Sequence, residues 1–232
     1  MKKYLLAAVA AAVFALPAQA ASLVAGGTAT FDATTVNTGT LIASQEFSGQ
    51  AFTFAATFRS AVYRRADGGL DFVYQVRHDG VGSLGSNNNI SGFTVAAFNG
   101  FTVDALRDGS DHDGAGPFTA PLNNIQGSGF TTLADRSVDG HVLTADFRGA
   151  PVGGGVNDLV QGETSTSYIF RTNAQNFQVG TFGVIDGSTL SGLTFAPTGA
   201  VPEPATWAMM LGGFGLLGAA ARRSSRAKTV LA

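Results

Sequence analysis

Residues 52–77 read FTFAATFRSAVYRRADGGLDFVYQVR and carry the clearest structural pattern in the chain. Apolar side chains occupy every second position at each end of this stretch: Phe52, Phe54, Ala56 and Phe58, then Leu70, Phe72, Tyr74 and Val76. A period of two places alternate side chains on one face of a β-strand, and the Asp-Gly pair between the two runs is a turn signal. The stretch therefore predicts a β-hairpin with one apolar face and with a second face that carries Asp71, Gln75 and Arg77.

The remainder of residues 21–198 has the composition of a β-protein. Gly, Thr, Ser, Val and Phe are abundant, and no window of twelve or more residues shows the apolar stripe of an amphipathic helix. We expect an all-β fold, an antiparallel β-sandwich of the jelly-roll or immunoglobulin-like kind. Clusters of Gly, Asn and Asp delimit further predicted strands at residues 90–97, 101–106, 142–147, 166–172, 178–184 and 193–196.

Charge is distributed unevenly along the 232 residues, although the whole chain has a formal charge of only −2. Residues 1–20 contain two lysines and no acid, whereas residues 199–232 contain four basic residues and one glutamate. Residues 21–198 contain eight arginines and fifteen acidic residues, a net charge of −7. This central region lacks the basic face that nucleic-acid binding requires. The chain also has no cysteine, which excludes disulfides, thiolate metal sites and cysteine nucleophiles.

Residues 1–20 have the three parts of a secretory signal peptide. Lys2-Lys3 is the basic start, residues 5–16 are apolar, and Ala18-Gln19-Ala20 is a small-x-small cleavage site. Twelve helical residues span about 18 Å, which is too short for an anchor across a hydrocarbon core of about 30 Å. We expect this segment to form a signal helix that engages the secretion translocon, and signal peptidase to cleave before Ala21.

A second apolar segment lies near the C-terminus, after a linker at residues 199–204. Its seventeen residues, 205–221, carry no charge, which is the lower limit of length for a transmembrane helix. A buried helix of the globular domain is the alternative, but the four glycines in this segment would cost about 1 kcal/mol each in a helix in water. We therefore predict a single transmembrane helix at residues 205–221.

The flanks of this predicted span carry three signals in a fixed order. Pro202-Glu203-Pro204 precedes it, Trp207 lies at its start, and Arg222-Arg223 open a basic tail at residues 222–232. A tryptophan at one interface and arginines on the cytoplasmic side are typical of a membrane span. The order of Pro-Glu-Pro, an apolar span with Trp207 and paired arginines resembles the PEP-CTERM sorting signal in its PEPxxWA variant.

The resemblance implies a route to the cell surface. In that family the tail is recognised and processed by an exosortase, a membrane-embedded enzyme of Gram-negative bacteria that make exopolysaccharide. By resemblance, Pro202, Glu203 and Pro204 form the recognition triplet. We expect an exported protein that is held transiently in the inner membrane and then reaches the cell surface or an extracellular matrix.

The exported domain at residues 21–198 shows no recognised catalytic pattern. The Gly-x-Ser-x-Gly motif of a serine hydrolase is absent, and His78, His112 and His141 do not have the spacing of a zinc-binding helix. We expect these histidines to lie at the surface. Most of the acidic residues are in turn-like contexts, where carboxylates bind local backbone groups. The sequence therefore predicts that the protein is not an enzyme.

One loop is a candidate metal site. Residues 108–114 read DGSDHDG, and Asp108, Asp111 and Asp113 supply oxygen ligands of the kind that calcium prefers. The loop does not match an EF-hand, because Ala120 occupies the position of the bidentate glutamate. A solvated acidic loop is the favoured interpretation and a structural Ca²⁺ site is the alternative. No other cofactor is expected.

The sequence favours a structural or adhesive role in an exopolysaccharide or biofilm matrix over two alternatives. The first alternative is a carbohydrate-binding module, for which Tyr63, Tyr74 and Tyr168 are stacking candidates and Arg64-Arg65 is a candidate contact for acidic polysaccharide. The second alternative is a secreted glycan hydrolase, which needs two carboxyl groups about 5 to 9.5 Å apart.

Overall fold

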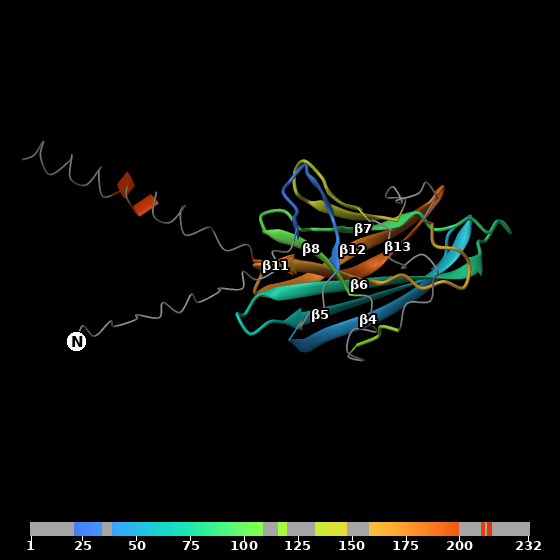
Figure 1. The fold of residues 1–232 in the computed structure, drawn as a ribbon, viewed down its shortest axis with the longest axis horizontal. Coiled ribbons are helices and arrows are strands. Elements are labelled where there is room, and N and C mark those ends of the chain that lie inside the picture. The colour runs from blue at the N-terminus through green and yellow to red at the C-terminus, as the bar shows by residue number, and fades with distance from the viewer. Residues whose placement is uncertain are drawn as a thin grey trace, which may run out of the picture.

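The computed structural model describes residues 21–33, 39–108, 116–119, 133–147, 158–199, 210–211 and 213–214. Almost all regular structure in these ranges is β-strand (Figure 1), which confirms the predicted all-β class. The strands are β1 (Ala21–Ser22), β2 (Thr28–Thr30), β3 (Asp32–Ala33), β4 (Thr40–Gln50), β5 (Phe54–Arg64), β6 (Leu70–Val81), β7 (Gly92–Ala96), β8 (Val103–Asp108), β9 (Leu133–Arg136), β10 (Val142–Asp146), β11 (Ser167–Thr172), β12 (Asn176–Asp186) and β13 (Ser188–Thr198).

The two terminal segments are described only in small part. The four described residues between 210 and 214 have helical backbone. The rest of the segments for which terminal helices were predicted, residues 1–20 and 205–221, lies outside the described ranges. Among the described residues, no helix is both long enough and apolar enough to cross a bilayer.

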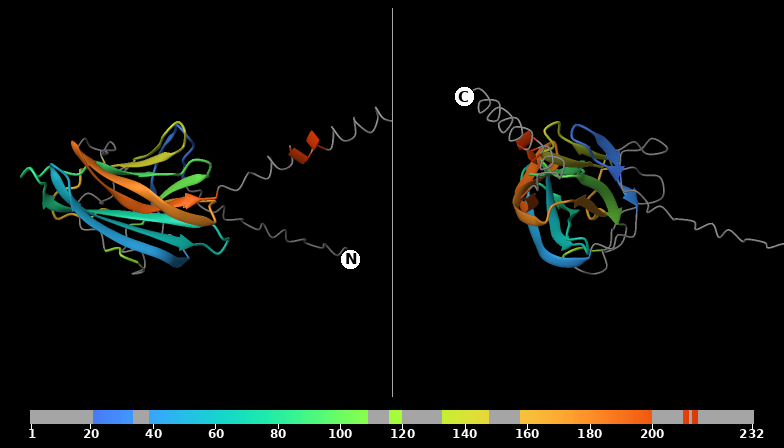
Figure 2. Two further views of the ribbon diagram at one scale, coloured as in Figure 1. Left: turned by 180° about the vertical axis from the view of Figure 1, so that it is seen from behind. Right: turned by 90° about the vertical axis from the view of Figure 1, so that its left-hand side faces the viewer.

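The strands form two sheets that pack face to face as a sandwich (Figure 2), as the sequence predicts. The first sheet has the order β1-β8-β11-β6-β5-β4, and the second has the order β13-β12-β7-β10-β9-β2. Strand β3 joins the first sheet beside β8 and pairs with it in parallel, whereas the other strand pairs among the described residues are antiparallel. The chain changes sheet repeatedly, so each sheet combines strands that are far apart in the sequence.

The predicted hairpin is confirmed as β5 and β6, which pair from Arg64 opposite Leu70 to Phe54 opposite Val81. The predicted apolar face points into the sandwich, where Phe58 and Tyr74 are among the fully buried side chains. Phe52 is the exception. It precedes β5 and its side chain is 65% exposed, so the alternation in the sequence extends one residue pair further than the strand does.

The second face of β6 is also buried, which the sequence pattern does not predict. Asp71 and Gln75 are both 0% exposed. Residues 116–119 lie over this face: the Gln75 Nε2 donates to the Thr119 carbonyl at 2.7 Å, and the Thr119 N–H donates to the Gln75 Oε1 at 3.1 Å. A smaller apolar cluster fills the space beneath this segment, formed by Ala61, Tyr63, Val73, Leu106, Phe118 and Ile169.

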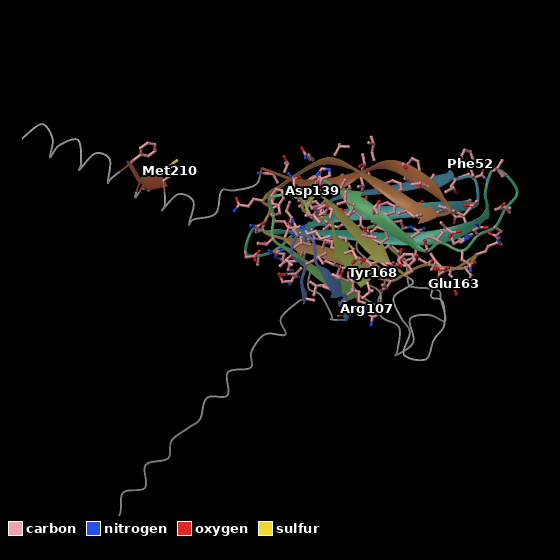
Figure 3. The ribbon with its side chains drawn as sticks, turned by 90° about the horizontal axis from the view of Figure 1, so that it is seen from above. Phe52, Arg107, Asp139, Glu163, Tyr168 and Met210 are labelled. Carbon is pink, nitrogen blue, oxygen red and sulfur yellow. The ribbon has the colours of Figure 1, made fainter. Side chains whose placement is uncertain are left out.

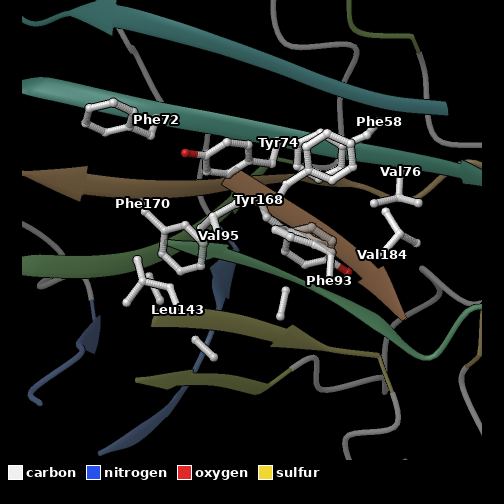
Figure 4. Close-up of a cluster of buried hydrophobic side chains, with 14 of the residues drawn as sticks. Phe58, Phe72, Tyr74, Val76, Phe93, Val95, Leu143, Tyr168, Phe170 and Val184 are labelled. Atoms are coloured by element: carbon white, nitrogen blue, oxygen red, sulfur yellow. The ribbon is translucent and has the colours of Figure 1, made fainter. Parts of the chain in front are cut away.

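Aromatic rings join the two sheets in the main core (Figure 4). The ring of Phe58 on β5 stacks on that of Phe182 on β12, with centroids 4.0 Å apart and planes 2° from parallel. Phe93 on β7 contacts Phe58 edge to face at 5.6 Å. Burying such rings removes roughly 150–250 Å² each from water, so they dominate the energy that holds the sheets together.

The sandwich has two ends with different contents. One end, which we call the base, contains Leu23, Val103, Asn176 and Thr198. There Thr198 pairs with Asn176, and the Leu23 N–H donates to the Val103 carbonyl. The opposite end, the tip, consists of residues 51–53, 81–89, 159–163 and 186–188. Figure 3 shows Phe52 and Glu163 at the tip and Asp139 towards the base.

Replacing Phe58 with alanine tests the importance of the contact between the sheets. We expect Phe58→Ala to lower the free energy of unfolding by roughly 3–5 kcal/mol, because it removes a buried ring and leaves a cavity. Urea denaturation of the full chain in detergent, followed by circular dichroism, measures the change. Phe52→Ala is the matched control and should change stability by no more than about 0.5 kcal/mol. Equal losses in the two variants would contradict this account of the core.

Candidate functional site

The outer face of the first sheet carries a row of charged side chains near the base. Arg171 on β11 lies directly opposite Asp71 on β6 and directly opposite Asp104 on β8. Directly opposite residues of antiparallel strands point to the same face of the sheet. The three side chains therefore form an acid–base–acid row across three neighbouring strands.

Asp71 is the centre of this network. Its carboxylate accepts hydrogen bonds from the Arg65 Nη1 at 2.6 Å, the Arg171 Nη2 at 2.8 Å and the Arg171 Nε at 3.1 Å. The hydrogen bond from Arg171 to Asp71 raises the pKa of that guanidinium. Both arginines bind one fully buried carboxylate, an arrangement in which opposite charges compensate one another.

The basic pair Arg64-Arg65 is occupied within the protein. Arg65 also donates to the Leu70 carbonyl at 3.2 Å and to the Thr172 carbonyl at 3.1 Å. Arg64 donates to the carbonyls of Gly68 and Gln175 at 3.4 and 3.2 Å. These guanidinium groups hold the turns at the base, so the structure gives no support to their role as a contact for acidic polysaccharide.

Asp104, on β8, is a partly buried carboxyl group whose pKa is perturbed. Burial raises its pKa, and the positive charge of Arg171 only partly opposes this effect. An acid of raised pKa beside a second carboxylate is one feature of a hydrolase site. However, Asp71 is two strands away, about 10 Å by strand spacing, and is fully buried beneath two arginines. This pair therefore fits a structural network better than a glycan hydrolase site.

The predicted calcium ligands are only partly described. Asp108 is the last residue of β8 and is 5% exposed, and its carbonyl oxygen accepts a hydrogen bond from the Thr166 hydroxyl. Asp111 and Asp113 lie outside the described residues. Within the described ranges, no group of three or more His, Cys, Asp or Glu side chains has the arrangement of a metal site. Calcium binding by this loop stays a prediction.

The expectation of surface histidines is wrong for His78, which is fully buried on β6. Its Nδ1 accepts a hydrogen bond from the Gly80 N–H at 3.1 Å, so the ring proton is on Nε2, which donates to the Asn88 carbonyl at 2.7 Å. Nε2 therefore attaches the loop at residues 82–89 to β6, whereas Nδ1 binds the backbone of β6 itself. His141 is only partly buried and its ring bonds to the Asn99 side chain, whereas His112 lies outside the described residues.

The tyrosines proposed as sugar-stacking groups are buried. Tyr63, Tyr74 and Tyr168 are each at most 1% exposed. The Tyr74 hydroxyl donates to the Phe195 carbonyl at 2.7 Å, and burial raises the pKa of Tyr74 well above its usual range. A platform built from these rings is therefore not accessible to a ligand. Phe52 at the tip is an exposed ring that the alternating pattern assigns, wrongly, to the core.

The predicted sorting and cleavage residues lie almost entirely outside the described ranges. Ala21 is the exception: it begins β1 and pairs with Ala105 on β8. The residues outside the description are Ala18, Ala20, Pro202, Glu203, Pro204, Trp207, Arg222 and Arg223. Their roles therefore rest on the sequence and on comparison with known proteins.

Comparison with protein families identifies the C-terminal segment. The described fold is an all-β sandwich whose last strand ends at Thr198. The segment that follows contains Pro202-Glu203-Pro204, an uncharged apolar stretch and Arg222-Arg223. Residues 200–224 match the family described as the PEP-CTERM protein-sorting motif. The chain therefore carries a PEP-CTERM sorting motif near its C-terminus, which marks it as an exported exosortase substrate. No curated protein and no solved structure matches the chain.

Replacing Asp71 with asparagine tests the network at the base. We expect Asp71→Asn to lower the free energy of unfolding by roughly 3 kcal/mol, because two partly buried arginines lose the buried carboxylate that they share. Asp67→Asn, at a side chain that is 66% exposed, is the control and should cost less than about 1 kcal/mol. Denaturant titration of both variants measures the difference. A loss at Asp71 no larger than that at Asp67 would be inconsistent with a buried ion-pair network.

The perturbed acidity of Asp104 gives a prediction with a defined pH dependence. Because the folded state raises its pKa, ionised Asp104 costs stability at neutral pH, and the cost disappears as the pH falls below the ordinary value of 3.8. We expect Asp104→Asn to stabilise the protein at pH 7 by less than about 1 kcal/mol and to have no effect at pH 3.

Asp139 is the control for Asp104, because its pKa is shifted in the opposite direction. Hydrogen bonds from the Ser137 hydroxyl and the His141 N–H lower the pKa of Asp139, so its contribution is present at pH 7 and is lost as the pH falls through its lowered pKa. Asp139→Asn should therefore destabilise the protein at pH 7 more than at pH 3. Thermal unfolding at the two pH values measures both variants, and a shared sign at pH 7 would refute the assignment.

Proposed function

We propose that this protein is an exosortase-sorted component of the bacterial envelope or extracellular matrix, with a structural or adhesive and non-enzymatic role. The observation that carries the proposal is the sorting motif at residues 200–224, which begins immediately after the last described residue of the sandwich. An exported protein with this motif is delivered to the cell surface, so the sandwich is the part that acts there.

The proposed route has three steps. The secretion translocon and signal peptidase export the chain and cleave it before Ala21. The predicted helix at residues 205–221 then holds it in the inner membrane of a Gram-negative cell, with the arginines of the tail in the cytoplasm. Exosortase processes it near residues 202–204 and releases the sandwich towards the exopolysaccharide of a biofilm matrix.

A non-enzymatic role is supported by how the described ionisable groups are used. Asp71 is fully buried on two arginines, Arg59 is paired with Glu46 at 2.7 Å, and both ring nitrogens of His78 bind backbone groups. Groups committed in this way stabilise the fold and are not available to transfer protons to a substrate. Adhesion requires only a stable scaffold and an exposed surface, and the sandwich supplies both.

The state of the C-terminus tests the sorting step. Mass spectrometry of the protein from the surface fraction of its host should show a mature C-terminus near residues 202–204. Replacing Pro202-Glu203-Pro204 with three alanines should retain the full-length chain in the membrane fraction. Ser224→Ala with Ser225→Ala is the control and should leave processing unchanged. Surface material that ends at an intact Ala232 would reject processing.

A further inference from the structure

We propose that the tip of the sandwich is a binding surface for an uncharged polysaccharide chain, with the ring of Phe52 stacked on a sugar ring. The inference rests on the proposed function, because it identifies the surface through which an adhesive matrix protein holds its partner. It names the class of ligand as a neutral glycan, and it excludes the buried tyrosines and the arginines at the base as the contact.

Two residues with exposed apolar side chains are joined through their backbones at the tip. Phe52 is 65% exposed and Leu84 is 73% exposed, and the Leu84 N–H donates to the Phe52 carbonyl at 3.1 Å. Val81 and Val160, which are 47% and 40% exposed, lie at the same end. An exposed ring of this kind offers a flat apolar face, and the C–H groups on one face of a pyranose are the matching surface.

The backbone around Phe52 is fixed before any ligand arrives. The Ser83 N–H donates to the Ala51 carbonyl at 2.9 Å, and the Asn88 N–H donates to the Thr53 carbonyl at 2.9 Å, so loop 82–89 runs along residues 51–53. His78 bonds to the Asn88 carbonyl from below. A surface that is already ordered loses little conformational entropy on binding.

Gly82 is part of the same fixed arrangement. A Cβ atom at this position would lie 2.4 Å from the Phe54 nitrogen and 2.5 Å from the Phe52 oxygen. Only glycine allows the loop to approach the chain at Phe52 this closely, because the clashing atoms are backbone atoms that cannot move aside. The close contact between the two segments of the tip therefore requires glycine at position 82.

The polar groups around the tip suit hydroxyl groups. The exposed carboxamides of the tip are those of Asn87, Asn88, Asn89 and Gln161, and that of Gln50 lies beside it and donates to the Val81 carbonyl at 3.3 Å. Each carboxamide has both donors and an acceptor, as sugar hydroxyls do. Asn87 and Gln161 join two segments of the tip, since the Asn87 Nδ2 donates to the Gln161 Oε1 at 2.8 Å. The amides are therefore held at one end of the molecule together with the exposed ring.

The charges at the tip argue for an uncharged ligand. The Asp79 carboxylate accepts from the Thr57 hydroxyl at 2.6 Å and pairs with Arg77, and the Glu163 carboxylate accepts from the Val160 N–H at 3.0 Å. Glu163 and Asp186 would repel an anionic polymer, and the nearby Arg77, which could attract one, is paired with Asp79. The same acids disfavour an anionic lipid surface, although the apolar side chains alone would suit lipid.

The position of the tip fits this role. The sorting motif follows Gly199, at the base, whereas Phe52 lies at the opposite end of the sandwich (Figure 3). While the protein is anchored through its base, the tip faces away from the point of attachment. The ligand surface and the sorting signal are therefore separate, and a change in one leaves the other intact.

Affinity electrophoresis of the full chain in detergent tests the inference. Gels containing dextran or hydroxyethylcellulose should retard the wild-type protein, and gels containing alginate should not. Phe52→Ala and Phe52→Leu should each weaken the retardation roughly tenfold in apparent Kd, because leucine keeps apolar surface but has no ring face. Phe52→Trp should retain binding. Leu193→Ala, at an equally exposed apolar residue on β13, is the matched control and should behave as wild type.

Three outcomes would overturn the inference. The first is the absence of retardation by every neutral glycan in a screen of both gels and a glycan array. The second is binding that Phe52→Leu leaves unchanged, which would indicate an apolar partner. The third is Phe52-dependent flotation of the mature surface protein with phosphatidylcholine vesicles, which would assign the tip to lipid. Circular dichroism confirms that each variant is folded.

The failures of the two proposals are distinguishable. Normal processing at residues 202–204 without glycan retardation would reject the tip as a glycan surface and leave the sorted structural protein in place. An intact Ala232 in surface material, with Phe52-dependent retardation, would reject the processing step and leave the glycan surface in place.

Discussion

The packing of aromatic rings between the two sheets is the constraint on which the rest of the structure depends. Phe58 and Phe182 stack at 4.0 Å across the interior, and Phe93 on strand β7 contacts Phe58 edge to face. The chain has no cysteine, so disulfides cannot supply the stability of this exported domain. The buried rings, together with the strand ladders, must do so. The hairpin β5–β6 supplies buried side chains to the cores on both faces of the first sheet.

Burial on both faces of the hairpin determines what its polar residues do. A carboxylate such as Asp71 can be buried only if it is fully compensated, and Arg65 and Arg171 provide that compensation from a turn and a neighbouring strand. Gln75 binds the backbone of Thr119 in the same way that a strand partner would, which keeps residues 116–119 on the sheet. The charged network therefore belongs to the scaffold. The polar groups that remain exposed, at the tip, are mostly carboxamides and hydroxyls.

The sequence predicts the fold where side-chain alternation is strong, and the hairpin and the sandwich architecture follow from it. Strand β4 was not predicted, because its side chains are mostly exposed and polar and its pattern is weak. Phe52 was assigned to the core because alternation does not show where a strand begins, and the turn before β5 places it in solvent. His78 and the second face of β6 were misjudged for a related reason: burial there comes from segments distant in the sequence. The sorting motif can be identified without knowledge of the fold, because the order of its residues in the sequence is sufficient to recognise it.

The family match covers only residues 200–224, which direct sorting. The role of the sandwich therefore has to be inferred from its own surface. A sorting tail acts on any body that can be exported and folded, so it places little constraint on the sequence between Ala21 and Thr198. Under the adhesive role proposed above, attachment would instead depend on side chains that face outwards from a rigid end. At the tip, two segments distant in the sequence are joined by backbone hydrogen bonds beneath Phe52 and Leu84, at a point where only Gly82 fits. Exposing two large apolar side chains on such a fixed support costs solubility without a gain in stability, which is the expected cost of a surface that binds a partner.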